Sequence, residues 1–154
     1  KDGVQQVILN GENVTSLLRT EETGKMASKT SKYAAVRTKL VALQRGLAKK
    51  TDVIMDGRDI GTTVLPDAFA KIYLTASSDA RAKRRYDELK EKGENCSFDA
   101  IKEDIEKRDY EDMHRAISPL KQADDAVLVD TSDMNIEQVV AALSKIIDEK
   151  KAGR

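Results

Sequence analysis

The sequence predicts an α/β fold with a mainly parallel sheet that carries helices on both faces. Three short runs rich in apolar residues, at residues 53–55, 71–75 and 126–129, have the length of strands and alternate with longer helical patterns. Strands that alternate with helices form parallel sheets, because each crossover helix packs back on the sheet. The first run is continuously apolar, which is typical of a parallel strand buried on both faces.

Residues 1–48 are predicted to form a subdomain with its own hairpin. Asn10-Gly11 lies between two short runs, at residues 5–9 and 12–14, and favours the type I′ turn whose twist matches paired strands. Thr20 precedes two glutamates, a pattern typical of a helix N-cap with acidic residues in the first turn. Two helices are expected after the hairpin, at about residues 20–31 and 33–49.

The remainder of the chain, residues 49–154, is predicted to contain the main sheet and three more helices. Polar residues that can cap a helix precede each helical pattern. The expected starts are Ser77 or Ser78 before a helix from Asp79, Ser97 before a helix over about residues 98–115, and Ser132 or Asn135 before a final amphipathic helix.

The composition excludes some classes of function. Lys and Arg number 27 and so do Asp and Glu, so the net charge is zero, which argues against a general nucleic-acid or membrane-surface binder. The single cysteine, Cys96, cannot form an internal disulfide, which favours a reducing, cytoplasmic location. No apolar run is long enough to span a bilayer.

A candidate ligand site follows the first apolar run. Asp56, Arg58 and Asp59 come where that strand is expected to end, and ligands of open α/β sheets bind outside the carboxyl ends of the strands. Gly57 and Gly61 allow a tight turn and close approach of the backbone. A surface turn rich in Asp and Gly is the simpler alternative for this stretch.

Arginines gather at four places along the sequence. The guanidinium fork suits bidentate recognition of phosphate, so these groups are candidates for an anionic ligand. Arg108, Asp112 and Arg115 are spaced by four and three residues and would share one face of a helix, although a solvated ion-pair face would give the same pattern. The four groups are Arg37; Arg58; Arg81, Arg84 and Arg85; and Arg108 with Arg115.

Three motifs resemble the bacterial cytidylate kinase family, and so does the start of the chain, Ile8-Leu9-x-Gly11-Glu12-x-Val14 followed by Leu18-Arg19-Thr20. The order and spacing hold from about residue 7 to residue 143. The motifs are Asp56-Gly57-Arg58-Asp59-Ile60-Gly61-Thr62, Ala76-Ser77-Ser78-x-x-Arg81-Ala82-x-Arg84-Arg85, and Arg108-Asp109-x-x-Asp112-x-x-Arg115-x-x-x-Pro119-Leu120. The resemblance implies a P-loop nucleoside monophosphate kinase fold. Residues 1–48 would be an inserted acceptor-binding subdomain, and residues 49–154 part of the kinase core with a lid at about residues 79–97.

The resemblance also implies an activity and a site. The family transfers the γ-phosphoryl group of ATP to CMP or dCMP, with Mg²⁺, in pyrimidine nucleotide metabolism. Ser28 and Arg37 would then hold the cytosine, and Asp59 and Asp112 the sugar hydroxyls. The phosphates would be bound by Arg58, Arg108 and Arg115, Mg²⁺ by Asp56 through water, and ATP by the lid residues Arg81, Arg84 and Arg85. The residues expected to take part in catalysis are Asp56, Arg58, Arg84 and Arg85.

One departure from the family is large, because no G-x-x-x-x-G-K-[ST] motif occurs in the 154 residues. That loop cradles the β- and γ-phosphates of ATP. With a first residue that is not Met, this suggests the C-terminal part of a longer protein, with an incomplete sheet. We therefore expect this chain alone to be inactive and prone to self-association, and the full-length protein to be a monomer.

Two alternative functions remain open from the sequence. The chain could be a non-catalytic CMP-binding or regulatory module, or part of another P-loop kinase that acts on a different small acceptor. The expected partners of the cytidylate kinase are the small-molecule nucleotides CMP or dCMP and ATP, and neither nucleic acid nor a membrane is expected.

Overall fold

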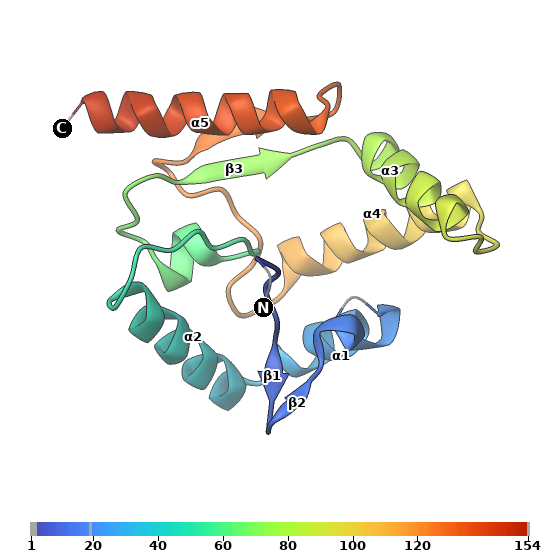
Figure 1. The fold of residues 1–154 in the computed structure, drawn as a ribbon, viewed down its shortest axis with the longest axis horizontal. Helices are drawn as coiled ribbons and strands as arrows, with labels where there is room; N and C mark the ends of the chain where they lie inside the picture. The colour runs from blue at the N-terminus through green and yellow to red at the C-terminus, as the bar shows by residue number, and fades with distance from the viewer. Residues whose placement is uncertain (1–2, 19, 154) are drawn as a thin grey trace. The chain divides into compact units, whose positions relative to one another are not determined.

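The computed structural model of the chain describes residues 3–18 and 20–153. It divides into two compact units, Lys1–Asp52 and Val53–Arg154, and each is described by itself. Figure 1 shows the elements of both units. In chain order they are β1 (Ile8–Leu9), β2 (Glu12–Asn13), α1 (Glu21–Thr30), α2 (Ala34–Ala48), β3 (Ile72–Thr75), α3 (Ser78–Glu91), α4 (Phe98–His114), β4 (Val127–Asp130) and α5 (Ile136–Ala152).

The first unit contains the predicted hairpin. Strands β1 and β2 pair antiparallel, with Ile8 opposite Asn13 and Leu9 opposite Glu12. Asn10 and Gly11 both have positive φ, 52° and 90°, as a type I′ turn requires, so the predicted turn is confirmed. The paired segments are shorter than predicted, because only two residues of each strand enter the ladder.

Helices α1 and α2 complete the first unit. The predicted N-cap is confirmed, since the Thr20 side chain accepts a hydrogen bond from the Thr23 backbone N–H at 3.3 Å. Both helices begin and end within two residues of the predicted positions. A 3₁₀ turn at Thr15–Leu17, which the sequence analysis did not predict, joins the hairpin to α1.

The sheet of the second unit has two parallel strands in the part of the chain that the structure describes. β3 pairs with β4 over their full length, from Ile72 opposite Val127 to Thr75 opposite Asp130. In Figure 1, α5 runs along this sheet. Among the described residues, the buried apolar side chains are Val64, Ala82 of α3 and Val129 of β4.

The predicted first strand of the main sheet, residues 53–55, is wrong. No strand is assigned there among the described residues, and the Ile54 side chain is 99% exposed instead of buried. An apolar run becomes a buried strand only when neighbouring strands satisfy its backbone groups and helices cover its faces. The segment therefore remains outside the sheet, which has two strands instead of the three predicted.

The candidate ligand loop after residue 55 contains a turn that was not predicted. Ile60–Val64 forms a π-helical turn, in which the Leu65 N–H donates to the Ile60 carbonyl at 2.7 Å. Such turns are rare and occur often at functional sites. Gly57 is needed here for close approach, because a Cβ at that position would lie 2.9 Å from Cγ1 of Ile60.

The caps of the last three helices resolve the alternatives left by the sequence. Ser77 rather than Ser78 caps α3, and Asn135 rather than Ser132 caps α5 in a complete capping box with Gln138. Ser97 caps α4 as predicted. Among the described residues, none of these or the other helices has the length and apolarity needed to cross a membrane.

Candidate functional site

Two of the predicted phosphate-binding arginines meet at one carboxylate. Nε of Arg58 lies 2.9 Å from Oδ2 of Asp112, and Nη1 of Arg115 lies 3.6 Å from Oδ1. Arg58 is about half exposed, whereas the side chains of Asp112 and Arg115 are only 19% and 17% exposed. We call these three residues the arginine cluster. Because two guanidinium groups share one carboxylate, the cluster carries a net positive charge.

The chain turn after α4 fixes Arg115 in the arginine cluster. Its Nε donates to the Ser118 carbonyl, and the Leu120 N–H donates to the Asp112 carbonyl at 2.8 Å. Ser118 has a φ of 48°, a left-handed conformation that is uncommon for serine. The Oγ of Ser118 also accepts a hydrogen bond of 3.4 Å from Thr63, so the turn is tied to the π-helical turn.

Arg115 has a free hydrogen-bonding position inside the cluster. Its Nη2 is buried and has no partner among the described residues. A buried donor without a partner is costly, so an unpaired guanidinium nitrogen beside other positive charge favours a bound anion. The donor set of the arginine cluster therefore fits a phosphate group.

The other acceptor-site candidates of this unit have different surroundings. Arg108 pairs with Asp104, one turn back on α4, at 3.1 Å, and both side chains are about half exposed. The Asp59 carbonyl accepts from the N–H groups of Thr63 and Val64, which starts the π-helical turn. Asp56 is exposed. Among the described residues there is no group of three or more His, Cys, Asp or Glu side chains that could hold a metal directly.

The three arginines of the predicted lid lie on α3 and have three different environments. Arg81 makes a bidentate pair with Asp109 of α4. Arg84 donates to the carbonyls of Thr131 and Met134, in the loop between β4 and α5. Arg85 pairs with Glu88 on its own helix, at 2.9 Å. The sequence analysis treated these arginines as one group, but in the structure each of them has a different partner.

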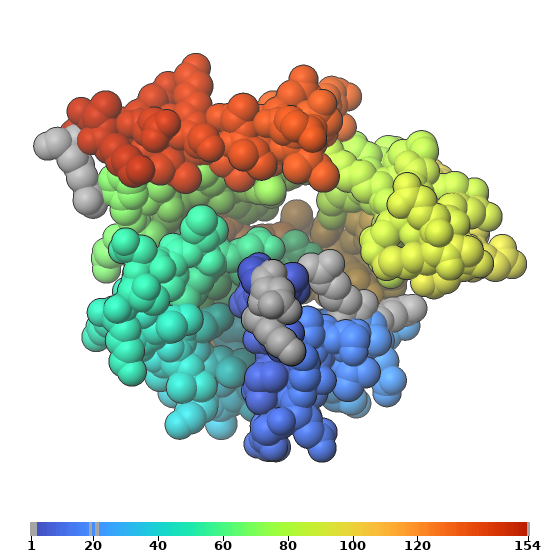
Figure 2. Space-filling model, in the orientation of Figure 1, coloured from blue at the N-terminus to red at the C-terminus, as the bar shows by residue number. Residues whose placement is uncertain are grey.

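A polar network at the carboxyl ends of β3 and β4 was missed by the sequence analysis. Thr131 is 3% exposed, and both its N–H and its Oγ1 donate to the Thr75 carbonyl, at 2.8 and 2.9 Å. Oγ of Ser132 accepts from the Ser77 N–H at 2.9 Å. Figure 2 shows the green surface at the start of α3 against the orange surface at the start of α5. The position of these residues after a strand was the signal that could have found them.

Ser132 also changes the ionisation of its neighbour. Hydrogen bonds from the Ser132 hydroxyl and N–H lower the pKa of Asp130, since both stabilise the carboxylate form. Asp130 therefore stays negative at the end of β4.

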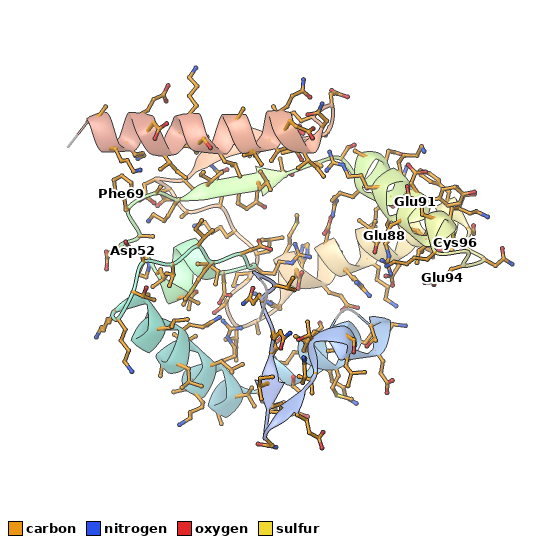
Figure 3. All side chains as sticks on the ribbon, in the orientation of Figure 1. Asp52, Phe69, Glu88, Glu91, Glu94 and Cys96 are labelled. Carbon is orange, nitrogen blue, oxygen red and sulfur yellow. The ribbon has the colours of Figure 1, made fainter. Side chains whose placement is uncertain are left out.

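Acidic residues lie at the C-terminal end of α3 and in the connection that follows it. Figure 3 shows Glu88, Glu91, Glu94 and Cys96 close to the connection between α3 and α4. Hydrogen bonds from Lys92 and Arg85 lower the pKa of Glu88 to about 2. Arg85 therefore has an ionised partner throughout the physiological pH range. Glu88 also pairs with Lys92, at 2.6 Å, so it keeps a cation partner if Arg85 moves away.

The two cytosine-site candidates belong to the first unit. Ser28 lies on α1 and is exposed, and its carbonyl accepts from the Ser31 hydroxyl at 2.8 Å. Arg37 lies in the first turn of α2 and is partly buried. The arginine cluster belongs to the second unit, Val53–Arg154.

The fold defines a protein of the α/β class. It combines helices with a small parallel sheet whose strands end in polar residues, an arrangement consistent with that of nucleoside monophosphate kinases.

Comparison with known proteins identifies the family. The family model for cytidylate kinase matches residues 1–149. A cytidylate kinase of Lactobacillus johnsonii is 52% identical over 151 residues, which cover 98% of this chain and 66% of the relative. A cytidylate kinase of Thermosipho melanesiensis is 47% identical over 142 residues, which cover 92% of this chain and 65% of the relative.

The chain therefore belongs to the cytidylate kinase family, as the resemblance predicted. Members of this family are nucleoside monophosphate kinases, which are phosphotransferases. The chain spans about two thirds of the length of the relatives it matches, 66% for that of Lactobacillus gasseri.

Proposed function

We propose that the protein transfers the γ-phosphoryl group of ATP to CMP or dCMP, and that residues 1–154 supply its acceptor site and lid. The family assignment and the relatives named cytidylate kinase support this function. The observation that carries the site is the arginine cluster, in which the buried Nη2 of Arg115 is left without a partner among the described residues.

In this proposal the cluster binds the phosphate of CMP. Arg58 is exposed enough to turn toward the ligand, Arg115 offers its free nitrogen, and Arg108 exchanges the exposed Asp104 for the phosphate. Breaking the Arg108–Asp104 pair costs little, because both groups remain solvated. Asp59 and Asp112 are proposed to accept hydrogen bonds from the sugar hydroxyls.

The cytosine site is proposed to lie in the first unit, with residues 1–48 as an inserted acceptor-binding subdomain. Ser28 and Arg37 offer a hydroxyl and a guanidinium, which can pair with the carbonyl, ring nitrogen and amino group of cytosine. The proposal also includes a kinase sheet that is incomplete within these residues. The segment that carries Ile54 supports that part, because this apolar side chain is 99% exposed.

Arg84 and Arg85 of the lid are proposed to stabilise the transferring phosphoryl group. Guanidinium groups around its equatorial oxygens compensate the charge of the transition state, and closure of the lid, about residues 79–97, excludes water. Mg²⁺ would neutralise charge on the ATP phosphates when bound. Asp56 is exposed and would hold that ion through water, because carboxylate oxygen suits a hard cation.

A phosphotransfer assay of the protein expressed from its complete reading frame tests this function. We expect CMP and dCMP to be phosphorylated by ATP, and Arg37→Ala to raise KM for CMP while KM for ATP is unchanged. Unaltered CMP kinetics in Arg37→Ala would contradict the proposed cytosine site.

One observation favours a second function, a non-catalytic CMP-binding or regulatory module. Residues 1–154 contain no G-x-x-x-x-G-K-[ST] motif, so they lack the usual loop for ATP phosphates. If the complete reading frame also lacks that motif and its product binds CMP without phosphorylating it, the assignment as a binding module is correct and the assignment as a kinase is wrong.

A further inference from the structure

The start of α3 is attached to α4 through a bidentate ion pair. Nη1 of Arg81 donates to Oδ1 of Asp109 at 3.0 Å, and Nη2 donates to Oδ2 at 2.6 Å. The Nε of Arg81 donates to the Ala76 carbonyl at 3.0 Å, just after β3. All three nitrogens of the guanidinium are therefore engaged. Their partners are the end of the sheet and the middle of α4.

Two further contacts lie in line with this ion pair. Oγ of Ser78 donates to Oε1 of Glu106 at 2.8 Å, and Nζ of Lys102 lies 2.8 Å from Oδ1 of Asp79. Residues 102, 106 and 109 are spaced by four and three, so they form one stripe along α4. The first turn of α3 therefore lies along that stripe and limits both sliding and rotation of α4.

The rotation of α4 matters because the same helix carries the arginine cluster. Asp109 stands one residue after Arg108 and three before Asp112. A rotation of α4 about its axis would move Asp112 away from Arg58 and change the direction of Arg108. Bidentate Arg–carboxylate pairs have a defined geometry as well as high strength, and this pair is partly shielded, with 33% and 20% exposure.

From these contacts we propose that Arg81 is a positioning residue, which with Asp109 fixes α4 so that Asp112 and Arg108 face the acceptor phosphate, and that it does not bind the nucleotide. This inference rests on the proposed function of the arginine cluster. It differs from the expectation, drawn from the sequence, that Arg81 binds ATP. If Arg81 left its partner for ATP, Asp109 would lose both hydrogen bonds while largely shielded from water.

By contrast, Arg85 has an ion-pair partner that it can leave at little cost. Its partner Glu88 lies on the same helix, both side chains are more than 40% exposed, and Lys92 remains on Glu88 if Arg85 leaves. Arg85 can therefore move toward a ligand at little cost, and Arg81 cannot.

The test is a double-mutant cycle on the full chain, with the dissociation constant of CMP measured by calorimetry and the free energy of unfolding measured in urea. Arg81→Gln and Asp109→Asn should each weaken CMP binding by about tenfold, and the double variant by no more than either alone, because residues of one contact couple. Arg81→Lys, which keeps the charge but loses the fork, should weaken binding less. Asp87→Asn is the matched control, since Asp87 pairs with Lys83 on the exposed face of α3, and it should leave CMP binding unchanged.

Three results would overturn the inference. They are additive losses in the double variant, a loss in Arg81→Gln without one in Asp109→Asn, and lower stability of folded variants with unchanged CMP binding. Failure of the unmutated chain to bind CMP is a different outcome, because it would contradict the proposed acceptor site and with it the role assigned to Arg81.

Discussion

At the scale of single residues, the candidate site depends on how a few charges are shared. Asp112 is the carboxylate to which both Arg58 and Arg115 are attached, and it is mostly shielded from water. Removing it leaves two guanidinium groups close together with no compensating charge. The contribution of Asp112 is therefore larger than that of an ordinary surface ion pair.

Asp112→Asn should lower the free energy of unfolding by about 1–3 kcal/mol, since it removes the carboxylate that two guanidinium groups share in a partly buried ion pair. Urea denaturation measures this change. Asp104→Asn is the control, because the Arg108–Asp104 pair on the same helix is about half exposed and should contribute less than about 1 kcal/mol. Equal losses of unfolding free energy in both variants would mean that Asp112 contributes no more to stability than an exposed ion pair does.

The lowered pKa of Glu88 predicts a pH dependence of stability. Its pKa falls from 4.5 to about 2 on folding, so its contribution is complete above pH 4.5 and is lost as the pH falls through 2. The unmutated chain should therefore be more stable than Glu88→Gln, and this difference in the free energy of unfolding should be larger at about pH 6 than at about pH 3. The excess should shrink in about 1 M salt, because Glu88 is exposed. A difference that does not vary with pH would contradict the assignment.

At the scale of elements, the candidate loop depends on Gly57. Gly57→Ala places a methyl group 2.9 Å from Ile60, so the π-helical turn or the backbone around Arg58 must shift. We expect a loss of about 1–3 kcal/mol in stability and weaker CMP binding.

Gly46→Ala is the matched control for this change. Gly46 lies inside α2 with nothing near its Cβ position, so alanine should stabilise the helix by about 0.5–1 kcal/mol. Unchanged CMP binding and stability in Gly57→Ala would show that the close approach to Ile60 is not required.

Local elements were predicted well from the sequence, and contacts between distant residues were not. The Asn10-Gly11 turn and the caps at Thr20 and Ser97 depend on a few adjacent residues, so their signals are local. Residues 53–55 failed as a strand because pairing depends on neighbours that no local pattern contains. The partner of Arg81 is 28 residues away, which is why its ion pair could not be foreseen.

At the scale of the whole molecule, large apolar side chains remain exposed on the sheet and in the segment before the candidate loop. Ile54 is 99% exposed, and Leu74 of β3 and Leu128 of β4 are more than half exposed. Exposed apolar side chains and unpaired strand edges promote association between chains. The chain belongs to the cytidylate kinase family, and the exposure of Ile54 is observed in the part of it that the structure describes.

Ile54→Lys should reduce concentration-dependent self-association in sedimentation velocity and should change the free energy of unfolding by less than about 0.5 kcal/mol, because the side chain is exposed. Ile136→Lys is the control, since Ile136 is 78% exposed at the start of α5. An equal reduction in both variants would mean that association is not specific to the segment of Ile54.

The most direct test of the central claim is a calorimetric titration of the folded 154-residue chain with CMP, with AMP and ATP as controls. The proposed acceptor site predicts saturable binding of CMP, weaker binding of AMP, and no binding of ATP, since the motif that cradles ATP phosphates is not in this sequence. Absence of CMP binding, or equal binding of CMP and AMP, would contradict the assignment of a cytidylate acceptor site to these residues.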